Sequence, residues 1–325
     1  AAEDLGTKLS VSHDLDKDAL TRDLYFKVGK QVGDFDWRLT AGREEDDDFT
    51  DIYDSKTLNK LNFRSDFLTA YNQYWTVQAG INESSFNRGD GAVNDIFRDE
   101  TASNSYQIIK WELVQHEVNT TLLFSHTKQD VEDRFLTPRL NEELASILES
   151  KGISGFENLL LEPTITLDIN FNRISERSDL EVYQIRTIGH NATFIYGASV
   201  RNDKVKSLYL FNNDDKYTVS TNRFFENLNW RLDADWTLDL GFMLEDTNYT
   251  NKELSTRISI IKKINQHSLR LISSSAKRNP TLSESIGDIQ FTINTLTYGS
   301  VVFKDSIGNS DVTPEKIHST EVGLF

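Results

Sequence analysis

The side chains of this sequence that could do chemistry do not form a recognisable catalytic or metal-binding motif. The six histidines lack the H-x-x-x-H or H-x-H spacing of a zinc site; they are His13, His116, His126, His190, His267 and His318. The chain has no cysteine, no Gly-x-Ser-x-Gly motif and no phosphate-binding loop. We therefore predict no catalytic residue, no cofactor and no metal site. A Ser-His-Asp set that assembles only in the fold stays open, because such residues need not be close in sequence.

A run of acidic residues lies within the stretch "DWRLTAGREEDDDFTD". Its carboxylates belong to Glu44, Glu45, Asp46, Asp47, Asp48 and Asp51. Carboxylate oxygens are ligands that Ca²⁺ prefers, but the run lacks the spacing and the central glycine of an EF-hand loop. A solvated loop, a contact with divalent ions that bridge lipopolysaccharide, and a calcium site all remain open for residues 44–51.

The composition excludes several classes of protein. The chain has 325 residues, a formal net charge of −16 and a mean hydropathy of −0.49. Its 35 Lys and Arg are scattered among 51 acids without a basic, aromatic-interleaved patch, so nucleic-acid binding is not expected. No run of eighteen apolar residues is present, which excludes a membrane-spanning helix. An apolar fraction of 38% is low for a large enzyme core and is typical of a sheet with two differently wetted faces.

One short phrase recurs at three places in the chain. Residues 37–42, 75–80 and 236–241 each read Trp-x-x-x-x-Gly. Side chains alternate along a β-strand, so two residues five positions apart face opposite sides. In the third copy, Leu240 shares the side of the tryptophan, whereas Asp239 shares the side of the glycine. The pattern therefore predicts strands with one apolar and one polar face.

About fourteen such strands can be placed along the chain. They lie near residues 5–13, 21–31, 35–43, 58–69, 74–84, 103–113, 118–128, 178–187, 191–201, 219–231, 236–246, 254–263, 267–276 and 318–325. The connections between them alternate strictly between short and long. Such alternation, with strands of about ten residues, favours an all-β fold in the form of an antiparallel transmembrane β-barrel. A soluble β-sandwich is the alternative, but it gives no reason for loops to be sorted by length.

The connection lengths also orient the predicted barrel. Short turns lie near 32–34, 70–73, 114–117, 188–190, 232–235 and 264–266, and long connections near 44–57, 85–102, 129–177, 202–218, 247–254 and 277–317. Each tryptophan of the repeated phrase follows a short turn. We therefore expect these tryptophans in the aromatic girdle of the periplasmic interface and the long connections outside the cell.

The longest connection contains a helix signal near residues 138–151. Thr137 is the predicted N-cap, Pro138 the first helical residue and Gly152 the residue that ends the helix. The apolar face of this helix comprises Leu140, Leu144, Ile147 and Leu148. The segment 164–173, "TITLDINFNR", alternates in polarity and is expected to extend the eighth strand beyond the membrane.

Five stretches of the sequence resemble the barrel of TonB-dependent outer-membrane receptors. "NSDVTPEKIHSTEVGLF" is similar to the family's Pro-Glu-Lys segment and the strand after it, and "HSLRLISSSAKRNPTLSE" is similar to the strand and loop that usually read Ser-Arg-x-x-Arg-x-Pro-Thr-Leu. "RSDLEVYQIRT", "NATFIYGASVRNDKV" and "FFENLNWRLDADWTLDLGFMLEDTNY" resemble consecutive mid-barrel strands. The resemblance covers nearly the whole chain.

The resemblance implies that residues 1–325 form part of a receptor barrel. The family has a plug domain inside a barrel of twenty-two strands, whereas the plug and its TonB-contacting segment are missing here. The stretch "EDLGTKLSVSHDL" resembles the first strand after a plug. We therefore expect a fragment, with the plug and the final strands outside this chain. The rival expectation is a complete fourteen-stranded barrel that closes by itself and ends on the aromatic Phe325.

By this resemblance, the function would be active import of a scarce nutrient, such as a ferric siderophore, cobalamin or an oligosaccharide, with energy supplied through TonB. The implied partners are outer-membrane lipid and lipopolysaccharide, the TonB complex through a plug that is missing here, and the small-molecule nutrient. The implied location is the outer membrane of a Gram-negative bacterium, with the protein as a monomer. A passive fourteen-stranded channel or porin and an outer-membrane barrel hydrolase are the two alternatives.

The long connections supply the candidate ligand contacts. These candidates are the aromatic and arginine residues Phe86, Arg88, Phe97, Arg98, Arg134, Phe135, Phe156, Tyr209, Phe211 and Tyr217. Packing among the loops is the competing role for each of them. The connections are net acidic, which disfavours a strongly anionic ligand unless the arginines cluster.

Overall fold

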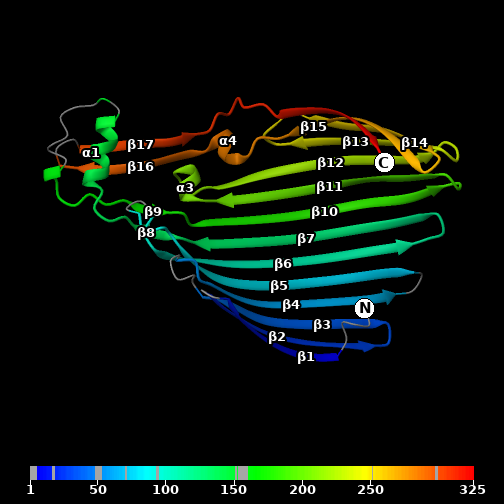
Figure 1. The fold of residues 1–325 in the computed structure, drawn as a ribbon, viewed down its shortest axis with the longest axis horizontal. Helices are drawn as coiled ribbons and strands as arrows, with labels where there is room; N and C mark the ends of the chain where they lie inside the picture. Colours follow the sequence, from blue (N-terminus) through cyan, green and yellow to red (C-terminus); the bar gives the residue numbers. More distant parts are fainter. Residues whose placement is uncertain are drawn as a thin grey trace.

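The computed structural model is built on one antiparallel sheet of fourteen strands (Figure 1). It describes residues 6–16, 19–47, 53–69, 72–92, 95–150, 152, 160–250, 252–296 and 299–325. In sheet order the strands are β1 (Gly6–Asp16), β2 (Ala19–Val32), β3 (Phe35–Asp46), β4 (Lys56–Thr69), β5 (Gln73–Arg88), β6 (Arg98–Val114), β7 (Val118–Glu132), β10 (Arg173–Ile188), β11 (Ala192–Lys206), β12 (Lys216–Arg231), β13 (Trp236–Thr247), β14 (Glu253–Ile264), β15 (His267–Arg278) and β18 (Glu315–Leu324). All fourteen predicted strands are confirmed, and most continue farther toward the long connections than predicted.

One face of the sheet is apolar and open to its surroundings. Leu228, Leu240 and Ile258 are direct neighbours across β12, β13 and β14, so they share this face. Phe124 and Leu180 are paired in the same way on β7 and β10. Leu180 is 47% exposed and Ile258 is 51% exposed. Soluble monomers rarely expose contiguous apolar surface on the scale of a whole sheet, so this face requires an apolar environment.

An aromatic row borders the apolar face at the end with the short turns. Phe35, Phe67, Trp75 and Trp111 follow one another across β3, β4, β5 and β6, with ring centroids 6.0, 6.1 and 6.4 Å apart. Each residue is the direct cross-strand partner of the next. Trp75 is the one tryptophan of the repeated phrase in this row; Trp37 and Trp236 also lie near the short-turn ends of β3 and β13, and a girdle at a membrane interface stays a prediction.

The glycine of the repeated phrase gives room for a tyrosine from a neighbouring strand. A Cβ atom on Gly42 would lie 2.8 Å from the ring of Tyr25, and one on Gly80 would lie 2.5 Å from the ring of Tyr106. At Gly241 the nearest atoms are 3.6 Å away, so the third copy follows the pattern without the close contact. Glycine thus lets an aromatic ring lie flat on the polar face of the sheet.

The acidic run belongs partly to the sheet and not wholly to a loop, because β3 continues to Asp46. The Glu44 carboxylate accepts hydrogen bonds from the Tyr25 hydroxyl and from Lys60 on the polar face. Glu45 pairs with Arg43, and Asp47 lies 3.3 Å from Arg22. Asp48 and Asp51 lie outside the described residues. Glu44, Glu45 and Asp47 therefore have basic partners from the protein itself.

The long connections build a small folded layer at one end of the sheet, on the left in Figure 1. Its elements are β8 (Arg134–Leu136), α1 (Asn141–Ser150), β9 (Asp168–Asn170), α3 (Leu208–Phe211), α4 (Leu282–Ile286), β16 (Asp288–Thr295) and β17 (Gly299–Ile307). Leu140 and Leu144, at the start of and within α1, are buried against Ile165 and Ile293, with Phe303 packed beside them. None of the described helices is long and apolar enough to cross a membrane.

Two predictions for the longest connection are wrong in detail. The helix begins at Asn141, because Thr137 is held in an extended segment by its backbone and by its hydroxyl, which accepts a hydrogen bond from Leu167 N at 2.8 Å. The segment 164–173 does not extend the eighth sheet strand; it contains β9, which pairs with β8. Gly152, the residue predicted to end the helix, has a positive φ of 72°. The side chains of Ile147 and Leu148 lie outside the described residues.

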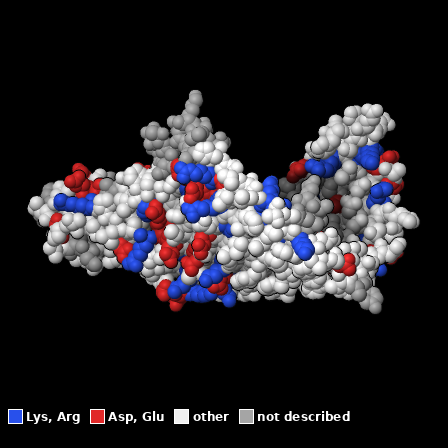
Figure 2. All heavy atoms as spheres, turned by 90° about the horizontal axis from the view of Figure 1, so that it is seen from below, with Lys and Arg blue, Asp and Glu red and all other residues white. Residues whose placement is uncertain are grey.

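The sheet is open between its first and last strands in the described residues. β1 and β18 form its two edges, and no pairing joins them. The alternation of connections also has an exception, because β1 ends at Asp16 and β2 already begins at Ala19 on the loop side. Figure 2 shows charged side chains gathered more densely over the loop-side half of the molecule than over the strands to the right of its middle.

Candidate functional site

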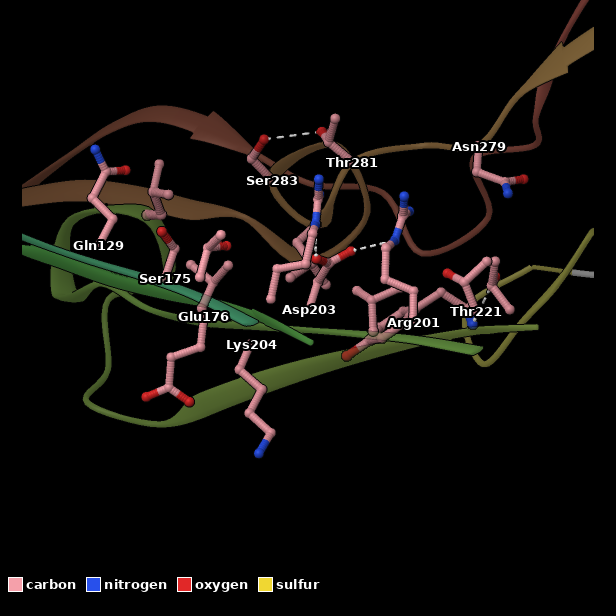
Figure 3. A pocket seen from close by; sticks show the side chains of 18 of the residues that line it. Gln129, Ser175, Glu176, Arg201, Asp203, Lys204, Thr221, Asn279, Thr281 and Ser283 are labelled. Carbon is pink, nitrogen blue, oxygen red and sulfur yellow. Dashed lines mark hydrogen bonds and ion pairs between the residues drawn. The ribbon is translucent and has the colours of Figure 1, made fainter. Parts of the chain in front are cut away.

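A cavity of about 780 Å³ lies between the polar face of the sheet and two short helices of the loops (Figure 3). Its wall includes Tyr106, Thr127, Arg177 and Asp203, which are direct cross-strand neighbours on β6, β7, β10 and β11. Its cover is formed by Leu210 and Phe211 of α3 and by residues 280–283 and 285, in and before α4. The cavity therefore exists only because a loop that begins after β15 folds back over β10–β13.

A charge cluster lies on the floor of the cavity. Arg177 Nε lies 2.5 Å from Asp203 Oδ1, and Arg201 Nε lies 3.0 Å from Asp203 Oδ2. The second contact is off the N–H direction, so Arg201 Nε makes an ion pair without a well-aligned hydrogen bond. Two guanidinium groups around one carboxylate leave donors of both arginines available to a bound polar molecule.

Next to the charge cluster is a buried hydroxyl group without a partner. Thr221 is 1% exposed, and its Oγ1 has no hydrogen-bond partner among the described residues. Thr221 also lines the cavity and is the cross-strand neighbour of Arg201. An unsatisfied buried hydroxyl costs about 1–3 kcal/mol, which a polar group of a ligand or a water molecule could recover.

The cover is joined to the wall by hydrogen bonds at Asn279. Asn279 Nδ2 donates to Glu245 Oε1 at 2.5 Å, and the same Glu245 pairs with Arg223 on the wall. Asn279 Oδ1 accepts from Thr250 Oγ1 at 3.2 Å, which ties in the loop between β13 and β14. The position of the cover is therefore fixed by side chains of three different strands and loops.

The helix α4 begins with a capping box, and the backbone at its C-terminal end packs against a glycine of a later segment. The Thr281 hydroxyl accepts from Glu284 N at 3.2 Å, and the Glu284 carboxylate accepts from Thr281 N at 2.7 Å. Beyond β17, Gly308 N donates to Gly287 O at 2.7 Å. A Cβ atom on Gly308 would lie 2.6 Å from the backbone nitrogens of Ile286 and Gly287.

We expect Gly308→Ala to displace α4 from the cavity. The clash is with backbone atoms, so a side-chain rotation cannot relieve it. An environment-sensitive fluorophore on Ser283→Cys, the single thiol in a chain without cysteine, would report the exposure of α4. Gly241→Ala is the control, because the φ of Gly241 is not positive and no atom lies closer than 3.6 Å to its Cβ position. Equal fluorescence changes in the two variants would contradict the assigned contact.

A second prediction concerns acid. The Arg278 side chain and the Thr281 backbone and hydroxyl donate to Glu284 and hold the pKa of its carboxyl at about 2, against a usual value of 4.5. Because the pKa is lower in the folded state, the contact stabilises α4 fully above pH 4.5 and this stabilisation is lost as the pH falls toward 2. The fluorophore at position 283 should report release of α4 across this range, and Glu284→Gln should abolish the transition. A transition that persists in Glu284→Gln would assign it to another group.

The predicted ligand residues are distributed over three places. Phe211, 2% exposed, lines the cavity and packs at a tilt against Tyr217, with ring centroids 4.4 Å apart. Arg98, Phe135 and Tyr209 belong to a second cluster, centred on Phe171: Arg98 lies over the Phe135 ring at 4.1 Å, and Tyr209 meets Phe171 at 4.5 Å. The loops therefore pack these residues against one another.

The other candidates lie toward the solvent. Arg88 pairs with Glu100 and lies over the ring of Phe86. Phe97 is 55% exposed and packs on Tyr53 at 5.0 Å, whereas Arg134 forms an exposed pair with Asp168. Phe156 lies outside the described residues. In the described part of the chain, the residues that line the cavity do not include Phe86, Arg88, Phe97 or Arg134. Ligand contact remains a prediction for all the candidates.

Apart from Phe211, the sequence reasoning missed the residues that line the cavity. Arg177, Arg201, Asp203 and Thr221 lie in strands whose alternation gives only the face, and no local motif marks them. Thr281 and Glu284 do carry a local signal, the Thr-x-x-Glu pattern of a helix start. The cavity offers guanidinium, hydroxyl and amide groups, and the described residues contain no cluster of three metal-ligating side chains. This chemistry suits the noncovalent binding of a polar molecule.

Comparisons with known proteins agree with the fold. The family model described as "TonB dependent receptor-like, beta-barrel" matches residues 5–324. Among solved structures, a double mutant of the ferric enterobactin receptor PfeA from Pseudomonas aeruginosa is 11% identical with a TM-score of 0.74, and the match covers 97% of this chain and 50% of that chain. The siderophore receptor PirA from Pseudomonas aeruginosa is 11% identical with a TM-score of 0.69, over 98% of this chain and 51% of that one.

A more distant likeness extends to the RagAB peptide importer, at 8% identity and a TM-score of 0.59, over 98% of this chain and 44% of that chain. The comparison with curated proteins gave no match. The chain spans about half the length of the solved receptors that it matches. At these identities the solved structures show the fold alone.

Proposed function

Because this chain belongs to the family of TonB-dependent receptor-like β-barrels, we propose that it forms part of the wall and the outer loops of an outer-membrane receptor that imports a scarce nutrient. The barrels of this family lie in the outer membrane of Gram-negative bacteria, and the family and the matching structures are receptors and importers. The apolar face would contact lipid, and the polar face would line the lumen. In the complete receptor the fourteen strands would belong to a barrel of twenty-two around a plug that contacts TonB.

The cavity between the wall and α4 is the observation that carries the proposal. A passive channel requires an open lumen, whereas here a loop covers a polar cavity on the lumenal face. A self-closing barrel of fourteen strands would also require β1 to pair with β18, and the described residues contain no such pairing. The nutrient would be polar and small, such as a ferric siderophore, cobalamin or an oligosaccharide, and the receptor would act as a monomer.

Uptake measurements test the proposal. Cells that express the full-length protein should take up one radiolabelled ligand from a set of ferric siderophores, cobalamin and oligosaccharides, and uptake should cease when TonB is deleted. Arg201→Gln, on the cavity floor, should weaken ligand binding by about tenfold or more through lost charge-assisted hydrogen bonds. Arg64→Gln is the control, because Arg64 is on the same face but pairs with Asp66 away from the cavity. Uptake that is unaffected by loss of TonB would support a passive channel, and release of a cleaved product would support a hydrolase.

A further inference from the structure

We propose that the apolar face carries, in the middle of the wall, a docking site for a basic side chain of another membrane-embedded protein. The site is a row of four polar residues, called the polar row below: Thr120 on β7, Gln184 on β10, Tyr196 on β11 and Glu226 on β12. Figure 1 shows these four strands side by side in the centre of the sheet. The proposal rests on the outer-membrane location given above and is independent of which nutrient is carried.

The polar row runs straight across its four strands. Thr120 is the direct cross-strand partner of Gln184, Gln184 is the partner of Tyr196, and Tyr196 is the partner of Glu226. Direct partners lie on the same face of a sheet. Leu228, on the apolar face, follows Glu226 by two residues in β12, so the whole row shares that face. Polar side chains therefore interrupt the apolar face at one defined place.

Apolar and aromatic side chains surround Glu226 at the end of the row. Its neighbours on this face of β12 are Phe224 and Leu228, and its cross-strand partner on β13 is Phe242. The ring centroids of Phe224 and Phe242 are 6.2 Å apart. Tyr196 lies on the fourth side, across β11. A carboxylate in this position has no other acid or base as a direct neighbour on its face.

Glu226 also lies deep in the apolar band of the wall. Trp230, at the short-turn end of β12, is on the same face and follows Glu226 by four residues. At about 3.3 Å per residue and a strand tilt of about 40°, the two residues differ in depth by roughly 10 Å. The apolar band of such a barrel is about 25 Å tall between its aromatic girdles, so Glu226 lies near the middle of the membrane. An ionisable residue at this depth indicates a functional contact with a polar partner.

The hydrogen bonds within the row leave Glu226 without a donor. The Tyr196 hydroxyl donates to Gln184 Oε1, and Gln184 Nε2 donates to Thr120 Oγ1 at 3.0 Å. The single hydroxyl hydrogen of Tyr196 is thus used inside the row. Glu226 has neither a hydrogen bond nor an ion pair with any of the described residues. An ionised carboxylate only accepts hydrogen bonds, so its partner must supply the donor.

The surroundings of Glu226 fit a lysine or arginine of a membrane-embedded segment. A basic side chain would form charge-assisted hydrogen bonds with the carboxylate. The rings of Tyr196, Phe224 and Phe242 can attract the same cation through their faces. Apolar residues beside the base would contact Phe224, which is 43% exposed. A charged group among aromatic side chains is typical of the centre of a protein interface.

A different protein suits this site better than lipid or a second copy of the chain. The hydrocarbon chains of lipid carry no cation. A two-fold contact between copies pairs a surface with itself, which would bring the acceptor Glu226 toward another acceptor. Arg186, on the same face, lies two residues before the end of β10, from where its long side chain can reach the headgroups. The base that pairs with Glu226 would therefore come from another chain.

Binding of a membrane peptide to the full-length protein in lipid vesicles would test the site. The probe is an apolar helical peptide of about twenty residues with one central arginine and a dansyl acceptor for the tryptophan fluorescence of the protein. The protein should bind it about tenfold more tightly than the same peptide with a central leucine. Glu226→Gln should abolish this difference. Asp239→Asn, which removes a carboxylate from the lumenal face of the next strand, is the control and should preserve it.

Photocrosslinking in native outer membranes would test for a natural partner. A benzoylphenylalanine in place of Phe224 should form a crosslink to another protein, and adding Glu226→Gln should remove that crosslink. The same group in place of Ile258, on the apolar face of β14, should crosslink lipid and no protein.

Four results would overturn the proposal. Two come from the vesicles: equal affinity for the two peptides, or a difference that persists in Glu226→Gln. The other two come from the native membranes: crosslinks to lipid alone at position 224, or a crosslinked product of twice the receptor's mass, which would indicate a second copy. Failure of the membrane location itself would appear differently, as a protein that does not insert into vesicles.

Discussion

Replacing Leu240 with arginine is expected to destabilise the folded protein in a bilayer by about 2–4 kcal/mol, the penalty for a basic residue near the middle of a lipid-facing strand. Leu240 lies centrally in β13 between Leu228 and Ile258, its neighbours on the apolar face. The free energy of unfolding from lipid vesicles, measured by urea titration, gives the comparison with the unmodified protein.

The matched control for this prediction is the adjacent residue on the other face. Asp239→Asn should change the free energy of unfolding little, because Asp239 faces the polar side, where the side chains of Asn227 and Asn229 contact it. Because the two adjacent residues face opposite sides of the sheet, comparing their substitutions distinguishes a wall that contacts lipid from a sheet surrounded by water. Equal losses of stability in the two variants would count against contact of the apolar face with lipid.

Arg98→Ala is expected to release the outer loops from one another, at a local cost of about 3–5 kcal/mol, because it leaves a buried carboxylate without its partner. Arg98 Nε lies 2.6 Å from Asp133 Oδ1, and the two side chains are only 13% and 5% exposed. The same guanidinium lies over the rings of Phe135 and Phe171. One residue at the start of β6 therefore holds the long connection between β7 and β10.

Hydrogen exchange of β8 and β9 would measure this release. Their backbone amides should exchange faster in Arg98→Ala, while the exchange of the sheet strands stays unchanged. Arg134→Ala is the control, since Arg134 pairs with Asp168 in the same hairpin but is 59% exposed and should contribute little. Faster exchange of the hairpin in the control and not in Arg98→Ala would reverse the assignment of the two ion pairs.

The strands could be predicted from the sequence, because a period of two in polarity depends only on neighbouring residues. The central part of β13 shows this clearly: Leu238, Leu240 and Phe242 alternate with Asp239 and Gly241. The loop-side ends of the strands extend farther than predicted, because polar residues such as Lys204 and Gln129 continue the pairing beyond the apolar belt. The β16–β17 hairpin lies inside a connection for which the sequence predicts only a long loop.

The cavity could not be predicted, because it depends on where loops distant in sequence come to lie. Asn279 reaches Glu245 across 34 positions in the chain, and nothing local to either residue predicts the contact. The loop aromatics show the opposite case. Phe135 and Tyr209 were selected by residue type, yet both pack around Phe171. Residue type indicates which side chains make contacts, but only the fold shows which groups those side chains contact.

The central claim is that the sheet is a membrane wall with lipid on one face and the lumen on the other. The most direct test is a nitroxide scan of residues 237–242 in β13, in the full-length protein in native outer membranes, which is simplified because this chain contains no cysteine. The account predicts that accessibility to oxygen peaks at 238, 240 and 242, while accessibility to a water-soluble nickel reagent peaks at 237, 239 and 241. Equal access of the water-soluble reagent to all six positions would contradict it.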